Sequence, residues 1–539
     1  MALSALASLV TLPYLADLCG FGLAPAASVV GSGLVTTAVA IAFGRDARWT
    51  RLDLGLWTLI VTAIFVALLS LSWPSLLPLG GGPDLTHHLA LVDYLEREGH
   101  LVEGPEAGGQ LGEMADYTPG LHVMAVVVGR VIGRDGFHAL YPVVALSVAL
   151  KVGFVFLILM RLLRGVPQQA PLAVGGVLMI VATSAYSLTS FTHDSFLAQV
   201  VAEFFAVAAW WAIVWWDRQP TRGAMALFAS ATIGVFLTWP VWLGPLVLTL
   251  CALALIRRDI SQRRQIEHLS IALAPVFMIA LIHMAGRIGA MGIVGTSGAV
   301  LQPTPEVLGL AVPVLAVLGV LFAVSDWRYR SLAIFAAALA LQAIALWVVA
   351  TLRGAATPYM AIKMTYLAIY PGAVAAIVAI ATAWEGIARV ILRRDGDDVR
   401  RMQRLAWVAT AVLTVVVVRD VIRTPQPPPI VSEDLWAAGR WLRATTAPEC
   451  VDYLVDNGYT AYWLHIAVMG NARAAARSID EETYRSQAAF GRWLVREGPP
   501  YAITNLDVLP AEILREVDIV RQFGRVAVIK RRSHQAGCG

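Results

Sequence analysis

Charged residues are scarce in this sequence. Only 14% of its 539 residues are Asp, Glu, Lys or Arg, whereas a typical soluble domain has about 25%. Hydrophobic residues make up 58% of the chain, and its mean hydropathy is +0.68. This composition predicts an integral membrane protein that sits in a lipid bilayer. The net charge of +4 gives no support to a nucleic-acid partner, because arginines in short membrane-protein loops set orientation instead.

Cysteine is scarce as well. The four cysteines include no C-x-x-C pair, which excludes a disulfide-built scaffold and a cysteine-rich metal centre. Cys19 and Cys251 lie in apolar segments, whereas Cys450 and Cys538 lie in the polar carboxyl-terminal region. Those last two can form one disulfide if that region is extracytoplasmic, or they can stay unpaired.

What the sequence has instead is long apolar runs. A helix needs about 20 mostly apolar residues to cross a bilayer. Candidate runs lie at residues 2–18, 23–44, 55–78, 140–160, 171–190, 197–216, 223–238, 241–256, 269–286, 306–323, 331–352, 362–384 and 405–418. They predict an all-α polytopic membrane domain over residues 1–418 with about thirteen transmembrane helices. The first run has no positive charge before it, so we expect it to be retained rather than cleaved as a signal peptide.

Arginine predicts how these helices are oriented. It is concentrated in the connections at residues 45–54, 161–170, 217–222, 257–268, 325–330 and 385–404, and it is sparse in the others. Arginine-rich short loops face the cytoplasm. The amino terminus is therefore expected inside, and the carboxyl terminus outside, a plasma membrane that we take to be a bacterial inner membrane.

The end of the chain differs from the rest. Residues 419–430 include a proline-rich linker, and residues 431–539 have ordinary soluble composition with alternating amphipathic and short apolar runs. This alternation predicts a small extracytoplasmic α/β domain. The region has no phosphate loop, nucleophile elbow or metal-ligand spacing. It can act in recognition, as a lid, or as a structural cap, and the sequence leaves these roles open.

One polar stretch, residues 79–137, interrupts the apolar pattern and is rich in acidic residues. If Pro83 begins a helix, then Asp84, His87 and His88 share one face and present a carboxylate beside two imidazoles. The alternative is that Asp84 only stabilises the helix N-terminus while the histidines lie at a wet interface. Residues 121–133 are expected to form an interfacial helix.

Other polar residues fall on the same predicted outer face. They are His193 and Asp194, which precede the run at 197–216, and Arg353 and Lys363, which flank the start of the run at 362–384. A lysine inside an apolar segment is costly. Lys363 either extends to the lipid headgroups or, together with Arg353, holds a phosphate at headgroup depth.

Two further features have more than one interpretation. Trp239 and Trp242 are typical of the interfacial aromatic belt, although aromatic faces also stack on sugar rings. Lys151 and Glu203 lie inside apolar runs, so they are either functional residues or a buried structural pair.

The sequence resembles the GT-C superfamily of membrane glycosyltransferases. The resemblance is carried by Asp84-x-x-His87-His88 just after an apolar run and by the return Tyr117-Thr118-Pro119-Gly120-Leu121-His122. The many-span body and the polar carboxyl-terminal region extend it over most of the chain. The chain departs from the family in having Tyr-Thr-Pro-Gly rather than a Tyr-Pro-Pro-Gly-like return, two additional spans before the loop, and no Asp-x-Asp or Glu-Asp doublet within residues 80–122.

This resemblance implies a glycosyltransferase that moves a sugar from a polyprenyl-phosphate donor to a hydroxyl of a glycan, lipid or protein acceptor. Asp84 matches the catalytic carboxylate position, and Lys363 lies where several members place a cation. An inverting displacement is expected, with Asp84 as general base and with Lys363 and Arg353 offsetting the charge of the leaving phosphate. The residues expected to contact substrate are His87, His88, Tyr117, His122, His193 and Asp194.

Three alternatives stay open. A divalent metal, Mg or Mn, can be shared by Asp84 with His87, His88 or Asp194, although we expect no metal site because nothing else completes the shell. A transporter or flippase of a lipid-linked sugar also fits a many-span chain, but no paired repeat typical of transporters is visible. A noncatalytic assembly or sensor protein is the third.

Overall fold

The computed structural model describes residues 1–43, 50–81, 83–103, 106–187, 189–285, 287, 296–298, 300–391, 396–423, 429, 431–471 and 485–532. Each of the apolar runs found in the sequence corresponds to a helix. These helices are α1 (Ala2–Leu18), α2 (Pro25–Phe43), α3 (Arg51–Ser72), α7 (Gly136–Leu162), α8 (Gln169–Ala182), α11 (Leu197–Arg218), α12 (Arg222–Thr238), α13 (Leu243–Ile256), α14 (Gln262–Met284), α16 (Ala311–Ser325), α17 (Arg330–Leu352), α18 (Tyr359–Ile391) and α19 (Gly396–Arg423).

Seven helices in the described part of the chain are long and apolar enough to cross a bilayer, namely α2, α3, α7, α11, α14, α17 and α18. The protein is thus a multi-pass membrane protein, as its composition predicts, while the number of thirteen spans stays a prediction. The run at 171–190 is interrupted, because α8 ends at Ala182 and the short helices α9 (Ser184–Ser187) and α10 (Thr189–Thr192) follow. Thr183 bonds through its hydroxyl to the carbonyl oxygen of Ile180 at 3.0 Å, a local bond that competes with helix continuation.

Helix α11 forms the centre of the bundle. It packs against α7, α12, α13, α17 and α18. Its apolar 18-residue segment is 94% buried inside the protein. By contrast, the corresponding segments of α2 and α3 are each only 11% buried, so most of their apolar side chains are free to contact lipid. A side chain that projects from α11 therefore lies in the protein interior.

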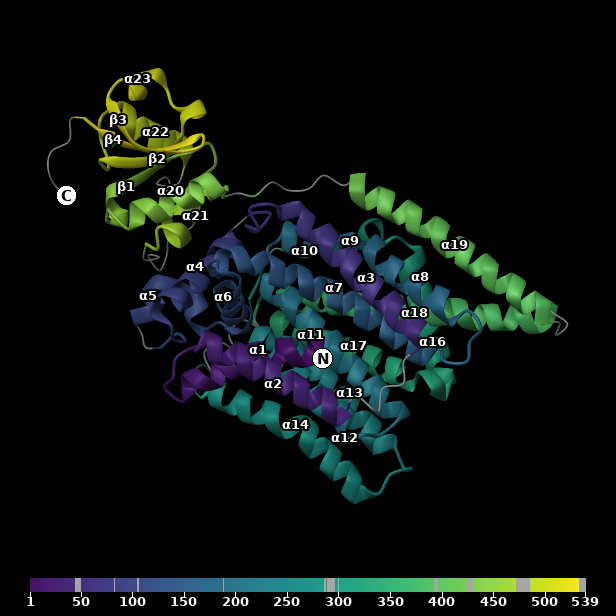
Figure 1. Cartoon of the computed structure of the whole chain (residues 1–539). Coiled ribbons are helices and arrows are strands. Elements are labelled where there is room, and N and C mark those ends of the chain that lie inside the picture. Colours follow the sequence, from purple (N-terminus) through teal and green to yellow (C-terminus); the bar gives the residue numbers. More distant parts are fainter. Residues whose placement is uncertain are drawn as a thin grey trace.

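The polar stretch folds into four short elements at one end of the bundle (Figure 1). They are α4 (Pro83–Glu98), α5 (Glu106–Leu111), the 3-10 helix η1 (Gly112–Asp116) and α6 (Gly120–Ile132). The predicted helix start at Pro83 is confirmed. Helix α6 is buried against α1, α2 and α7, more deeply than an interfacial helix. Its first residue must be glycine, since a Cβ at Gly120 would lie 2.6 Å from the carbonyl oxygen of Leu237.

The carboxyl-terminal region forms a small α/β domain, as predicted. Its elements are α20 (Glu433–Arg443), β1 (Val451–Leu454), α21 (Gly458–Trp463), a π-helix (Leu464–Val468), α22 (Ser486–Leu494), β2 (Tyr501–Asn505), α23 (Ala511–Leu514), β3 (Val517–Phe523) and β4 (Val526–Arg531). The sheet has the order β1-β2-β4-β3. Strand β1 pairs in parallel with β2, and the other pairs are antiparallel.

This domain contacts α4 and the start of α7 directly. Asp93 of α4 accepts hydrogen bonds from Arg440 at 2.7 Å and from Arg443 at 2.8 Å. His138 of α7 lies 3.1 Å from a carboxylate oxygen of Glu433. Ion pairs on a buried carboxylate such as Asp93 are costly to break, so they fix the domain against the helix that begins at Pro83.

Two sequence predictions about the carboxyl-terminal region fall largely on residues outside those described. The predicted linker 419–430 is described only as far as Arg423 and at Pro429, which makes an isolated bridge with Gly80. Cys450 is disulfide-bonded, and Cys538 lies outside the described residues. Cys19 and Cys251 are free.

Candidate active site

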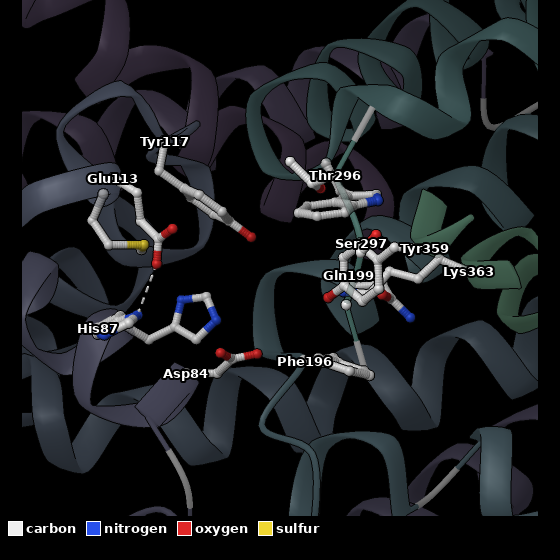
Figure 2. A pocket seen from close by; sticks show the side chains of 14 residues that line it. Asp84, His87, Glu113, Tyr117, Phe196, Gln199, Thr296, Ser297, Tyr359 and Lys363 are labelled. Atoms are coloured by element: carbon white, nitrogen blue, oxygen red, sulfur yellow. Dashed lines mark ion pairs between the residues drawn. The ribbon is translucent and has the colours of Figure 1, made fainter. Parts of the chain in front are cut away.

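A cavity of about 540 Å³ lies where α4, η1, α11 and α18 meet. The residues that line it are Asp84, His87, His88, Glu113, Met114, Tyr117, Phe196, Gln199, Trp239, Thr296, Ser297, Gly298, Tyr359 and Lys363. Figure 2 shows Asp84, His87 and Glu113 on one side, with Gln199, Tyr359 and Lys363 across from them. The cavity therefore has an acidic wall and a cationic wall.

The acidic wall starts from the first turn of α4. Asp84 and His87 are one helical turn apart, and the Nδ1 atom of His87 lies 3.2 Å from a carboxylate oxygen of Glu113. Burial raises the pKa of Asp84 above its usual 3.8, while the charges of Lys363 and His87 oppose the rise. Asp84 thus combines partial desolvation with access to the cavity, which is the environment of a carboxylate tuned for proton transfer.

His88 lines the cavity and also contacts a second histidine behind it. Its Nδ1 atom lies 2.9 Å from Nε2 of His122, and the two rings stack with centroids 5.1 Å apart. Burial lowers the pKa of His88, and it lowers the pKa of His122 to about 3. The pair is therefore neutral, with one ring nitrogen donating to the other.

Tyr117 completes this wall, and its phenol points into the cavity (Figure 2). Its ring meets the rings of His88 and His122 edge to face, at centroid distances of 5.7 and 5.8 Å. Burial raises the pKa of Tyr117 well above its usual value, so the phenol is a hydrogen-bond donor at neutral pH.

The cationic wall consists of Lys363 within three aromatic rings. Its Nζ atom lies 3.8 Å from the ring centroid of Phe196, 4.5 Å from that of Tyr359 and 4.9 Å from that of Trp239. We call these three residues the aromatic cage. Lys363 is only 4% exposed, so it does not extend to lipid headgroups along the protein surface. Among the described residues no carboxylate forms an ion pair with it, and ring faces offset a buried cation only in part.

Several residues expected from the sequence do not line the cavity. Arg353 is exposed at the carboxyl-terminal end of α17. His193 and Asp194 are exposed in the connection before α11. His122 lies behind His88. Of the two cations predicted to hold the phosphate, Lys363 lines the cavity and Arg353 does not.

Other lining residues were not found from the sequence. Glu113 lies on η1, outside any periodic pattern. Tyr462 of the carboxyl-terminal domain is not a lining residue, but it reaches to 3.4 Å from Nε2 of His87. Gln199 does carry a signal, because Glu203 follows it one turn later on the same face of α11. That spacing could have predicted a polar face that leads to the cavity.

The described parts of the chain contain no group of three or more His, Cys, Asp or Glu side chains arranged to hold a metal ion. His88 is turned toward His122, and Asp194 does not line the cavity. The ligand set proposed from the sequence, Asp84 with His87, His88 or Asp194, is therefore not assembled around one point.

Comparisons with known proteins were made on sequence and on structure. No family model matches the sequence, and no curated protein matches it. The structure of ArnT from Cupriavidus metallidurans bound to undecaprenyl phosphate is similar over 89% of this chain and 99% of that chain, with 17% identity and a TM-score of 0.49. The archaeal oligosaccharyltransferase AglB from Archaeoglobus fulgidus, in complex with an inhibitory peptide and a dolichol-phosphate, has 12% identity and a TM-score of 0.45 over 86% of this chain and 70% of that chain.

The arabinofuranosyltransferase AftD from mycobacteria has a higher TM-score. It is similar over 90% of this chain and 42% of that chain, with 14% identity and a TM-score of 0.52. At this identity the likeness speaks for the fold alone. Over the part that matches, the chain has the same fold as this arabinofuranosyltransferase.

Proposed function

We propose that this protein is a membrane glycosyltransferase that moves a sugar from a polyprenyl-phosphate donor to an acceptor hydroxyl. The observation that carries the proposal is that Asp84 and Lys363 line opposite walls of one cavity. Such a reaction needs a base for the acceptor proton and a cation for the leaving phosphate, and the two walls offer one of each.

The donor class follows from the depth and environment of Lys363. It lies one turn inside α18, a membrane-spanning helix, where a phosphate carried on a lipid can reach it. Its nearest partners are the rings of the aromatic cage, and no carboxylate of the described residues forms an ion pair with it, so an incoming phosphate would supply a paired anion. Undecaprenyl phosphate in the ArnT structure and dolichol-phosphate in the AglB structure support a polyprenyl phosphate as the carrier.

The chemical step is a single displacement. The acceptor hydroxyl gives its proton to the carboxylate of Asp84 as its oxygen bonds to the anomeric carbon. The bond between that carbon and the phosphate oxygen breaks, and the polyprenyl phosphate leaves with its electron pair beside Lys363. Attack opposite the leaving group inverts the anomeric centre. Every step is assigned to residues of this chain, and none is routed through a metal ion.

The remaining parts of the proposal concern placement. The cavity would open on the extracytoplasmic face of a bacterial inner membrane, with the amino terminus inside and residues 431–539 outside. Residues 1–418 would form the catalytic domain. The acceptor would be a glycan, a lipid or a protein that enters beside α4, where Tyr462 of the carboxyl-terminal domain meets His87.

The test uses the purified protein in lipid nanodiscs. Undecaprenyl phosphates carrying single pentoses or hexoses are offered together with glycan, lipid and peptide fractions of the cell envelope. The proposal expects one donor to be converted to undecaprenyl phosphate while a labelled sugar appears in one acceptor fraction, as read by mass spectrometry. A transporter or a sensor would leave all donors intact, and that result would reject the proposal.

The pH dependence of this activity follows from Asp84. Because burial raises its pKa above 3.8, kcat/KM should fall on acidification at a pH above that of an ordinary aspartate. Glu113 also raises the pKa of Asp84 and Lys363 lowers it. Glu113→Gln should therefore move the acid limb to lower pH, and Lys363→Met should move it to higher pH. An acid limb that both variants leave in place would show that another group is the base.

A further inference from the structure

Beneath the cavity, a row of polar side chains continues into the helix bundle. Gln199 lines the cavity, and Glu203 follows one turn later in α11. Glu203 forms an ion pair with Lys151 of α7 and accepts a hydrogen bond of 2.6 Å from the phenol of Tyr370 in α18. All four side chains are buried. The buried pair of Lys151 and Glu203, one of the two interpretations of the sequence, is thus formed, and it lies directly below a residue of the cavity.

Some of these atoms have no partner. One carboxylate oxygen of Glu203, Oε1, and both polar atoms of the Gln199 amide lack a hydrogen bond among the described residues. An ionised carboxylate only accepts hydrogen bonds, whereas an amide donates through Nε2 and accepts through Oε1. Residues four apart share a helix face. Nε2 of Gln199 is therefore the donor that suits Glu203, and this arrangement leaves the amide oxygen, which is itself buried, as the acceptor for a ligand in the cavity that Gln199 lines.

An amide oxygen in this position can bind only a ligand group that donates a hydrogen bond. It cannot bond to a phosphate oxygen, which is also an acceptor, but it can accept from a sugar hydroxyl. Its position indicates which hydroxyl. Phe196, the residue just before α11, stacks under Lys363 at 3.8 Å. Phe196, Gln199 and Lys363 line the same cavity, so the amide is close to the proposed phosphate position and hence to the anomeric end of the sugar.

We propose that Gln199 accepts a hydrogen bond from the 2-hydroxyl of the donor sugar, and that Glu203, held by Lys151 and Tyr370, positions the amide for it. The inference rests on the proposed function and adds a donor class, a sugar with a free hydroxyl next to its anomeric carbon. Gln199 is then a specificity-determining residue, and Glu203 is a positioning residue two turns from the aromatic cage.

The experiment compares an undecaprenyl-phosphate sugar that the wild-type protein accepts with its 2-deoxy analogue, in nanodiscs. A site built to bond a hydroxyl strongly rejects the analogue that lacks it. The wild-type protein should therefore prefer the full donor by about 100-fold or more in kcat/KM. Gln199→Met keeps the length of the side chain but removes the acceptor, and it should reduce this preference to a few-fold. Glu203→Gln should reduce it in part, because the amide of Gln199 is no longer held in one orientation.

The control is Ser147→Ala, which removes a buried hydroxyl of α7 that, within the described parts of the chain, bonds to the carbonyl oxygen of Val143 alone. It should leave the preference unchanged. A structural role of Gln199 would lower activity on both donors by the same factor and leave the preference intact, and this result would overturn the inference. A wild-type protein that accepts both donors equally well would also overturn it, without any variant.

A second readout separates this inference from the proposed function. Retention of the two lipids by the purified protein is measured by native mass spectrometry, which requires no turnover. If the wild-type protein retains the full donor in preference to the 2-deoxy analogue, and Gln199→Met abolishes that preference, the inference holds even where no transfer occurs. If the wild-type protein retains neither lipid, the inference and the proposed function fail together.

Discussion

Asp84→Asn is expected to lower kcat by about 1,000-fold at saturating donor, because general-base assistance contributes on the order of 100- to 10,000-fold. The amide keeps the shape of the side chain but cannot take the acceptor proton. Donor binding should change little, because the phosphate is held across the cavity at Lys363. The measurement is single-turnover transfer by purified protein, together with donor retention by native mass spectrometry.

The matched control for this prediction is Asp116→Asn. Asp116 lies on η1 in the same polar stretch, but its side chain is exposed and it does not line the cavity. This variant should keep activity within about two-fold of the wild type, in line with most surface substitutions. If both variants lose activity equally, or if Asp84→Asn retains most of it, Asp84 is not the base.

Lys363→Met is expected to weaken donor binding by about 10- to 100-fold, the range that corresponds to a hydrogen bond with a charged partner. The unbranched thioether can fill the aromatic cage, so the loss reports on charge rather than on packing. Lys363→Arg should rescue only in part, because the planar guanidinium does not fit a cage whose ring centroids lie 3.8 to 4.9 Å from the ammonium. The measurement is donor affinity, with undecaprenyl phosphate itself as a second ligand.

Arg353→Met serves as the comparison for this variant. Arg353 was paired with Lys363 on sequence grounds, but its side chain is exposed at the end of α17. We therefore expect a change in donor affinity of less than about three-fold, as for a screened surface charge. Equal effects at the two positions would mean that the phosphate lies outside the cavity, near the surface.

Much of the architecture could be predicted from the sequence because apolar length and arginine placement report directly on bilayer crossing. Pro83 predicted the start of α4, and the short apolar runs after residue 430 predicted the small sheet. The interruption after Ala182 could not be predicted from hydropathy, since the side-chain bonds of Thr183 and Ser187 to helix carbonyls do not change the mean polarity of the segment.

The candidate site could likewise be predicted from the sequence only in part. Asp84 and Lys363 could be placed on the same side of the membrane because each lies at the end of a predicted span. Predicting the side of the membrane needs only the positions of the spans. The aromatic cage could not be predicted, since Phe196, Trp239 and Tyr359 come from three separate segments and look like ordinary interfacial aromatics. The pairing of His88 with His122 depends on how α6 is buried against the bundle, which no spacing within the sequence reveals.

The central claim is that the donor phosphate binds at Lys363 with its sugar directed toward position 84. An electron cryo-microscopy structure of the Asp84→Asn variant in nanodiscs with a bound undecaprenyl-phosphate sugar tests it most directly. We predict a phosphate oxygen within hydrogen-bond distance of Nζ of Lys363, and the anomeric carbon between that phosphate and the side chain at position 84. A phosphate bound outside this cavity, or a sugar directed away from α4, would contradict the account.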